Sequence, residues 1–382
     1  MAHPLPSTIA KIILDWERWW IFCFTTRGHP VISEAFNPQD VDATRGRLSV
    51  YLDQNHWRSV AELRVDASKI KTAAEAGAAS RVVALAQDLG VILPVSSAHM
   101  RETAPLYGDL RYNVGVAIGS LSAGWQMRHP SAVWMMEAIA LVADMLSVPV
   151  PSYTKRSVVT LEPGALMQQA SEVAIEPLDG VPLLLKLLSA PGVVLAMLID
   201  PESVKSVDLD RWAAENQAIT DRVSRMEVDR TTRRRAAIEE FWRSNFQIIR
   251  DAGAILGVDV EHLYGLDGAV LDGALKRLPM LAYVSGLHAM RYSDRATKWK
   301  SNDLTDIMFL ACATGYCSYV VAERHTGEQL RSLQRAAKVP VTVHTSLEAL
   351  RLDLDSVGVR TEEERTSVRS TERLSEGPRI SH

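Results

Sequence analysis

Two short apolar runs separated by a helical pattern constrain the fold of this chain most strongly. Residues Leu48–Leu52 and Val91–Val95 each have the length and composition of a strand. Between them, apolar residues recur at helical spacing from Ile70 to Leu89. Two strands joined through a helix lie parallel in one sheet, and the crossover is right-handed in nearly all proteins. This stretch therefore predicts a parallel strand–helix–strand unit.

A second segment with the same texture lies near the other end of the sequence. A helix is expected from about Leu304 to Ala313, followed by the strand Ser318–Ala322. A helix near residues 328–337 and a short strand, Val339–Val343, follow, and Pro340 favours a sheet edge for that strand. Together the two segments predict one parallel sheet with helices on both faces.

The long middle of the chain is mostly helical in pattern. It includes an expected helix at Ala132–Leu146 and a charged, helix-forming stretch from Leu209 to Leu256. For the arginine cluster in that stretch, a solvated helix face is favoured over a nucleic-acid contact. The cluster comprises Arg230, Arg233, Arg234 and Arg235.

The bulk composition indicates a globular protein. The 382 residues are 47% hydrophobic and 23% charged, and the net charge of −4 argues against a basic coat while allowing a local basic groove. Three cysteines are too few for a disulfide framework and favour a reducing cytoplasm. The apolar segment Val181–Ile199 contains Lys186 and Pro191, so a buried helix and strand are expected there rather than a membrane span. We expect a soluble, cytoplasmic protein.

Acidic residues follow the predicted strands. Asp53 and Glu323 each come directly after a strand, and Glu102 lies about two helical turns beyond Val95. Asp306 lies in the first turn of its helix and joins the others only if that helix begins on the same side. Because ligands bind at the carboxyl ends of parallel strands, these acids are expected at one edge of the sheet.

Clustered carboxylates raise each other's pKa, and a hard divalent cation relieves the repulsion. Two such ions can activate a water and stabilise the leaving oxygen of a phosphodiester. Each acid also has a structural interpretation taken alone. Asp53 can cap a helix, Asp303 and Asp306 can stabilise a helix start, and Glu102 and Glu323 can be surface positions. The prediction of a metal site rests on their combination.

These motifs resemble the PIN-like family of metal-dependent ribonucleases. The segment Val50–Trp57 looks like the family's first strand ending in Asp, and Leu93–Glu102 is similar to its second acidic element. The segment from Asn302 to Arg324 resembles the helix and strand that carry the third and fourth acids. The chain departs from the family pattern in having Glu323 where Asp is usual, and Gln54 where Thr is common.

The resemblance implies a three-layer α/β/α fold with a central parallel sheet and a large, mostly helical insertion. The implied organisation is an N-terminal extension (1–46), the first half of the PIN-like domain (47–103), the insertion (104–297), the second half (298–351) and a disordered charged tail (352–382).

The activity implied by the resemblance is cleavage of single-stranded RNA with Mg²⁺ or Mn²⁺. Asp53, Glu102 and Asp306 would hold the metal, and Glu323 would complete the four catalytic acids. Asn55 is expected to orient Asp53 or to bind a metal-bound water. Asp303 is expected as a helix cap or behind the metal ligands, and His99 as a supporting residue one turn before Glu102. Basic residues flanking the third and fourth acids would bind phosphates, namely Lys298, Lys300 and Arg324.

Three functions stay open from the sequence. The first is an active endoribonuclease, which could be the toxin of a toxin–antitoxin pair with an antitoxin as partner. The second is a catalytically weak PIN-like scaffold that binds RNA or another protein. The third is a DNA nuclease, because no residue in the pattern is assigned to a 2′-hydroxyl.

Overall fold

The centre of the molecule is a parallel sheet assembled from both ends of the chain. The computed structural model describes residues 8–37, 40, 43–70, 72–151, 156–166, 180–200 and 209–366. The strand order is β5-β4-β8-β9, and neighbouring strands are parallel. The bounds are β4 (Leu48–Leu52), β5 (Val91–Ile92), β8 (Tyr319–Val321) and β9 (Val343–His344). The expected parallel sheet of an α/β fold is therefore present, with shorter outer strands than the sequence predicts.

Helices bury one face of this sheet. Val50 and Leu52 of β4 point into a core that also contains Trp57, and all three are at most 1% exposed. Tyr51, between them in the strand, belongs to a different core, as alternation along a strand requires. The helices that contribute to the first core include α1 (Gln54–Val65), α2 (Ala73–Gln87) and α14 (Leu347–Ser356).

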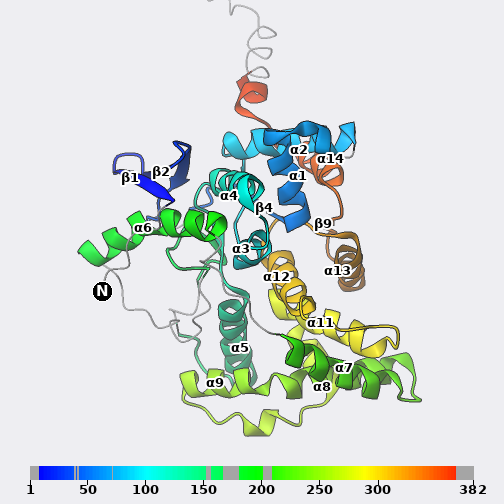
Figure 1. Cartoon of the computed structure of the whole chain (residues 1–382). Coiled ribbons are helices and arrows are strands. Elements are labelled where there is room, and N and C mark those ends of the chain that lie inside the picture. The colour runs from blue at the N-terminus through cyan, green and yellow to red at the C-terminus, as the bar shows by residue number, and fades with distance from the viewer. Residues whose placement is uncertain are drawn as a thin grey trace, which may run out of the picture.

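The second core joins the other face of the sheet to the helical middle of the chain. Most of the helical middle lies below β4 in Figure 1. It shares with the sheet one continuous buried cluster that includes Tyr51, Trp134 and Phe241. Glu137 holds three of its helices together by accepting hydrogen bonds from the backbone of Met280 and Leu281 and from the Tyr316 hydroxyl. The helices of this part are α5 (Pro130–Leu146), α7 (Asp210–Ser224), α8 (Arg230–Ser244), α9 (Phe246–Leu256), α10 (Gly268–Leu275), α11 (Pro279–Ser293) and α12 (Asp303–Tyr316).

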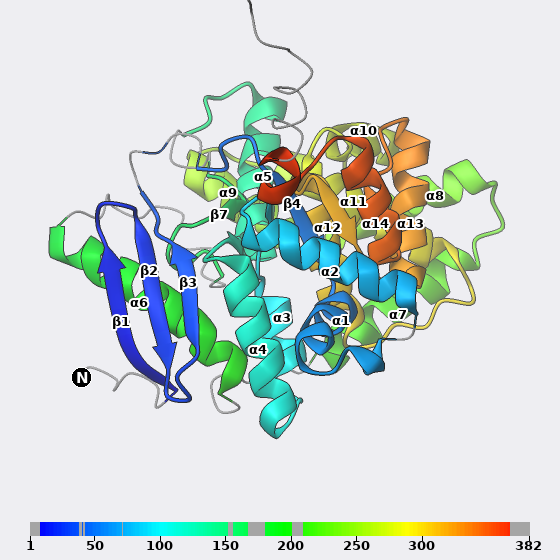
Figure 2. The ribbon, with the colours of Figure 1, turned by 90° about the horizontal axis from the view of Figure 1, so that it is seen from above.

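An antiparallel sheet lies beside this body. Its strands are β1 (Ile9–Asp15), β2 (Trp20–Thr25) and β3 (Pro30–Glu34), and α6 (Gly180–Ile199) packs across it (Figure 2). Next to α6 runs α4 (Gly108–Ser122), and a Cβ atom at Gly115 would lie 2.5 Å from Ile199 Cγ2. A short pair, β6 (Gln126–Met127) with β7 (Val159–Thr160), completes the described strands.

Two sequence predictions are corrected here. The segment Val181–Ile199 contains no strand, because α6 continues to Ile199 with Pro191 inside the helix. The charged tail was expected to be disordered from residue 352, whereas α14 extends to Ser356 and Leu354 is fully buried. Residues 367–382 of that tail lie outside the described part. None of the helices described is both long and apolar enough to cross a membrane.

Candidate functional site

The first and fourth acids are joined at the carboxyl ends of two adjacent strands. Asp53 follows β4 and caps α1, its Oδ1 accepting a hydrogen bond from the Gln54 amide (2.9 Å). Glu323 follows β8 and occupies the N-cap position of α13 (Arg324–Ala337). The Glu323 amide donates to Asp53 Oδ2 (3.2 Å), and the Asp53 amide donates to the Val321 carbonyl (2.8 Å). Asp53 is thus a helix cap and a bridge between strands at once.

The second and third acids reach the same edge from two helices. Glu102 lies on α3 (Ser97–Thr103), and Asp306 lies in the first turn of α12. Burial raises the pKa of Glu102 to about 8, with further contributions from the charges of Asp53, Asp306 and Glu323. Burial likewise raises the pKa of Asp306 to about 7, with repulsion from Asp53 and Glu323. The structure therefore brings the four predicted acids close enough for their charges to interact.

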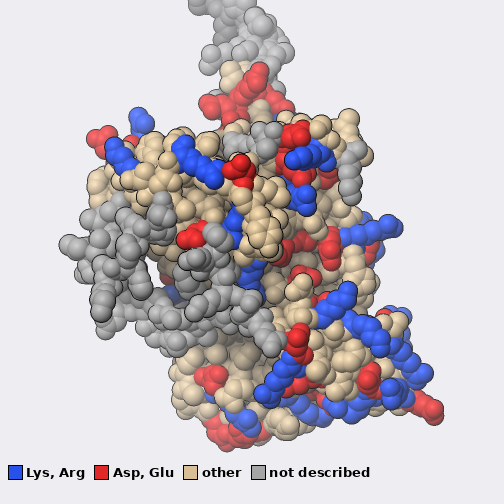
Figure 3. Space-filling model, in the orientation of Figure 1, with Lys and Arg blue, Asp and Glu red and all other residues tan. Residues whose placement is uncertain are grey.

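The donor chemistry of this acid cluster suits a hard divalent cation. Carboxylate oxygens are the ligands that Mg²⁺ and Mn²⁺ prefer, and repulsion between them favours a bound cation. Acidic side chains gather near the middle of the face in Figure 3, where Figure 1 places α12 and the start of α13. Within the described ranges, however, no three His, Cys, Asp or Glu side chains stand close enough to share an ion. Sharing one metal would require these carboxylates to rotate towards a common point.

His99 supports the site through the backbone. It is buried, its Nδ1 accepts a hydrogen bond from the Ser96 amide (3.0 Å), and its Nε2 donates to the Leu52 carbonyl (2.8 Å). Burial lowers the pKa of His99 to about 4, so the ring is neutral at physiological pH. His99 therefore fixes α3 against the end of β4, one residue before Asp53, and is not available as a base.

Asp303 is held by a neighbouring cation. It accepts hydrogen bonds from Arg291 and from the Lys300 amide, the latter at 2.7 Å. These contacts fix the loop before α12, and Asp306 lies one turn further along the helix, at the acid cluster. The N-cap of α12 is Asn302, so the prediction of Asp303 as the helix cap is wrong. Asp303 instead ties the start of α12 to Arg291 and Lys300.

The remaining predicted residues are exposed. Lys298 and Lys300 are exposed, and Trp299 between them is buried, its indole donating to Thr220 Oγ1 (2.7 Å). Arg324 and Asn55 are exposed too. No hydrogen bond joins the Asn55 side chain to Asp53 among the described residues, so the expected orienting contact is not formed here.

Beside Glu323 there is an open groove that sequence patterns do not predict. It has a volume of about 500 Å³ and lies between α11 and α13. Because Met290 is far in sequence from the other lining residues, only the tertiary fold creates this feature. The lining residues are Met290, Arg324, His325, Glu328, Gln329 and Ser332.

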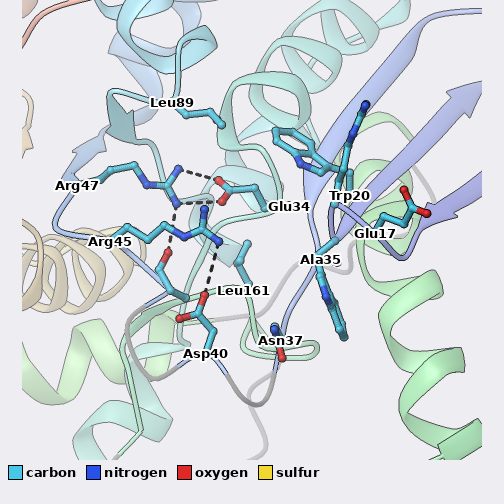
Figure 4. A pocket seen from close by; sticks show the side chains of 13 residues that line it. Glu17, Trp20, Glu34, Ala35, Asn37, Asp40, Arg45, Arg47, Leu89 and Leu161 are labelled. Atoms are coloured by element: carbon cyan, nitrogen blue, oxygen red, sulfur yellow. Dashed lines mark hydrogen bonds and ion pairs between the residues drawn. The ribbon is translucent and has the colours of Figure 1, made fainter.

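A separate cavity of about 370 Å³ lies near the amino end of β4, away from the acid cluster (Figure 4). At this cavity, Arg47 donates to both carboxylate oxygens of Glu34 (2.8 and 3.0 Å), and the Trp125 indole donates to the same carboxylate (2.8 Å). Arg47 and Glu34 therefore pair with each other, and this ion pair links β3 to the parallel sheet.

Searches against protein-family models, curated proteins and solved structures found no match to this chain. The resemblance to the PIN-like family stays a prediction from the motifs. Function is therefore argued from the chain's own residues.

Proposed function

We propose that this chain is a divalent-metal-dependent endoribonuclease that hydrolyses single-stranded RNA at the acid cluster. The observation that carries the proposal is the placement of four acids at one sheet edge. Asp53 and Glu323 follow adjacent strands and share a hydrogen bond, and α3 and α12 bring Glu102 and Asp306 to them. Burying acids that repel each other disfavours their charged forms, and such perturbed groups concentrate at functional sites.

Asp53, Glu102 and Asp306 would hold Mg²⁺ or Mn²⁺, which supplies an activated water and neutralises developing charge on the phosphodiester. Glu102 holds a proton at neutral pH because its pKa is about 8. Cation binding would release that proton, since a metal ligand must be ionised. Asp53 is kept in place by its backbone hydrogen bonds, and Glu323 adds negative charge at the exposed rim.

The groove between α11 and α13 supports a single strand as the substrate. It begins at the residue after Glu323, and its guanidinium, imidazole and amide groups can bind phosphates and base edges, while Glu328 adds one negative charge among them. Lys298 and Lys300 supply further exposed positive charge next to α12. An open groove with dispersed charge suits a flexible strand that can present its backbone to the acids.

The test is cleavage of labelled single-stranded RNA in the presence of Mn²⁺. Asp53→Asn should lose activity by at least roughly a hundredfold, because replacing groups that only support metal ligands already costs roughly 10–100-fold. Asp251→Asn, an exposed substitution on α9, should cleave like the wild type. Equal activity of wild type and Asp53→Asn would reject the proposal. A single-stranded DNA of the same sequence tests the DNA nuclease alternative.

A catalytically weak scaffold is the second candidate. The distances between the acidic side chains favour this scaffold function, because no three metal-binding side chains of the described residues stand close enough to share an ion. Calorimetry that detects no Mn²⁺ binding, together with stable binding of the RNA, would support this function over the nuclease.

A further inference from the structure

Arg101 lies at the acid cluster, although no sequence motif points to it. It directly precedes Glu102 on α3 and is partly buried. Its guanidinium carbon stands 5.5 Å from the centre of the Phe309 ring. Phe309 is one turn beyond Asp306 on the same face of α12. The guanidinium thus lies between the two helices that bring Glu102 and Asp306 to the site.

Within the described part of the chain, Arg101 differs from other buried or partly buried arginines in having no hydrogen-bonding or ion-pair partner, only the Phe309 ring. Arg47 pairs with Glu34, Arg128 with Glu162 and Arg291 with Asp303. Arg101 forms no ion pair or hydrogen bond with any described residue. None of its nitrogens is among the buried polar atoms that lack a hydrogen-bond partner, and the residue as a whole is partly exposed.

An unpaired guanidinium beside carboxylates needs a reason, because pairing is normally favourable there. Arginine has five N–H donors in a planar fork that matches two phosphate oxygens. Because Arg101 forms no ion pair with a carboxylate of the described residues, its donors can bind an anionic ligand beside Glu102.

We infer that Arg101 binds the phosphate group that is presented to the acid cluster, a role that rests on the proposed nuclease function. The exposed residues Lys298, Lys300 and Arg324 then bind neighbouring phosphates of the strand. Arg101 is the partly buried member of this set, next to Glu102 itself. The ligand class is a phosphodiester of a single-stranded RNA.

The test compares how Arg101→Met changes two affinities, one for RNA and one for Mn²⁺. Methionine keeps an apolar side chain against Phe309 and removes the positive charge. The affinity for a short fluorescent single-stranded RNA, measured by anisotropy in Ca²⁺, should fall by roughly tenfold, the loss of a charge-assisted hydrogen-bonding group. The affinity for Mn²⁺, measured by calorimetry without RNA, should stay equal or increase because a repelling charge is gone.

Two further variants keep the result interpretable. Arg335→Met removes an exposed arginine from the last turn of α13 and should bind RNA like the wild type. Arg101→Lys keeps the charge without the planar fork, so its RNA affinity should lie between those of wild type and Arg101→Met. Arg101→Lys also gives a readout if the methionine variant does not fold.

Unchanged RNA affinity in the folded Arg101 variants would overturn the inference, and so would a wild type that does not bind the RNA. If RNA binding depends on Arg101 but the wild type does not cleave, the inference holds and the nuclease proposal fails. If the wild type cleaves and the Arg101 variants bind RNA normally, the nuclease proposal holds and Arg101 has no phosphate-binding role.

Discussion

Glu102 and Asp306 retain protons at pH values at which carboxyl groups in water are ionised. Burial is the main cause, and the pKa values are about 8 and about 7. A carboxyl whose pKa is higher in the folded than in the unfolded state stabilises the fold below its unfolded pKa. That stabilisation is lost as the pH rises through the folded pKa. In the absence of metal, stability should therefore decline between about pH 4.5 and pH 8.

This pH dependence of stability predicts the effect of Glu102→Gln. The neutral amide should raise the free energy of unfolding at pH 8.5 by about 2 kcal/mol, allowing for partial solvent screening, and change it far less at pH 5. Urea unfolding at both pH values measures the difference. Glu348→Gln, on α14, serves as the control. A Glu102→Gln effect that is the same at both pH values would show that this carboxyl is ionised throughout.

His99→Ala tests the supporting role of the imidazole. It should destabilise the fold by about 2–4 kcal/mol, because the Ser96 amide and the Leu52 carbonyl lose buried partners. Urea unfolding measures this loss. In the wild type, any activity should show no ionisation that depends on His99 near pH 6.5, since burial holds the pKa of His99 at about 4. A pH–rate inflection near 6.5 that disappears in His99→Gln would contradict this role.

At the scale of elements, Glu137 links the helix that carries Asp306 to the rest of the core. It lies on α5, and its carboxylate accepts from Met280 and Leu281 at the start of α11 and from Tyr316 at the end of α12. Glu137→Ala should cost about 3–5 kcal/mol, since three buried donors lose their acceptor. Glu137→Gln keeps an acceptor oxygen and should cost less. Urea midpoints of both variants check the order, and equal midpoints would contradict it.

The sequence predicts elements well where the signal is local. The strands at Leu48 and Val91 and the helix beginning near Asp303 follow from residue patterns. The sequence predicts one helix in the crossover between those strands, and the crossover contains two, α1 and α2. In Val181–Ile199, by contrast, the mostly apolar pattern fits either one helix or a helix followed by a strand, and periodicity alone does not distinguish the two. The strand predicted at Val339–Val343 is also displaced in the structure. Strand β9 begins only at Val343, and the residues from Val339 to Thr342 are not part of it.

The site is predictable only in part for a related reason. Asp53 and Glu323 are found from sequence because each ends a strand. Arg101 and the groove at Met290 are not, because they depend on how α3 meets α12 and how α11 meets α13. Such helix contacts carry no signal in the local pattern of either helix.

At the scale of the whole molecule, β4 joins the two cores. Val50 and Leu52 belong to one and Tyr51 to the other, so neither core can lose its packing without exposing part of the central strand. The described fold should unfold in one cooperative transition. Tryptophan fluorescence reports on both cores, through Trp57 and Trp134, and should coincide with circular dichroism during urea unfolding. Separate midpoints would show that the helical part unfolds on its own.

The acid cluster as a metal site is the central claim, and proton release tests it most directly. Calorimetric titration of the wild type with Mn²⁺ at pH 7, in two buffers of different ionisation enthalpy, should show binding with release of on the order of one proton. That proton comes from Glu102 and Asp306, whose pKa values are about 8 and about 7. The double variant Glu102→Gln, Asp306→Asn should lose both signals. Absence of Mn²⁺ binding to the wild type, or equal binding and proton release by the double variant, would contradict the claim.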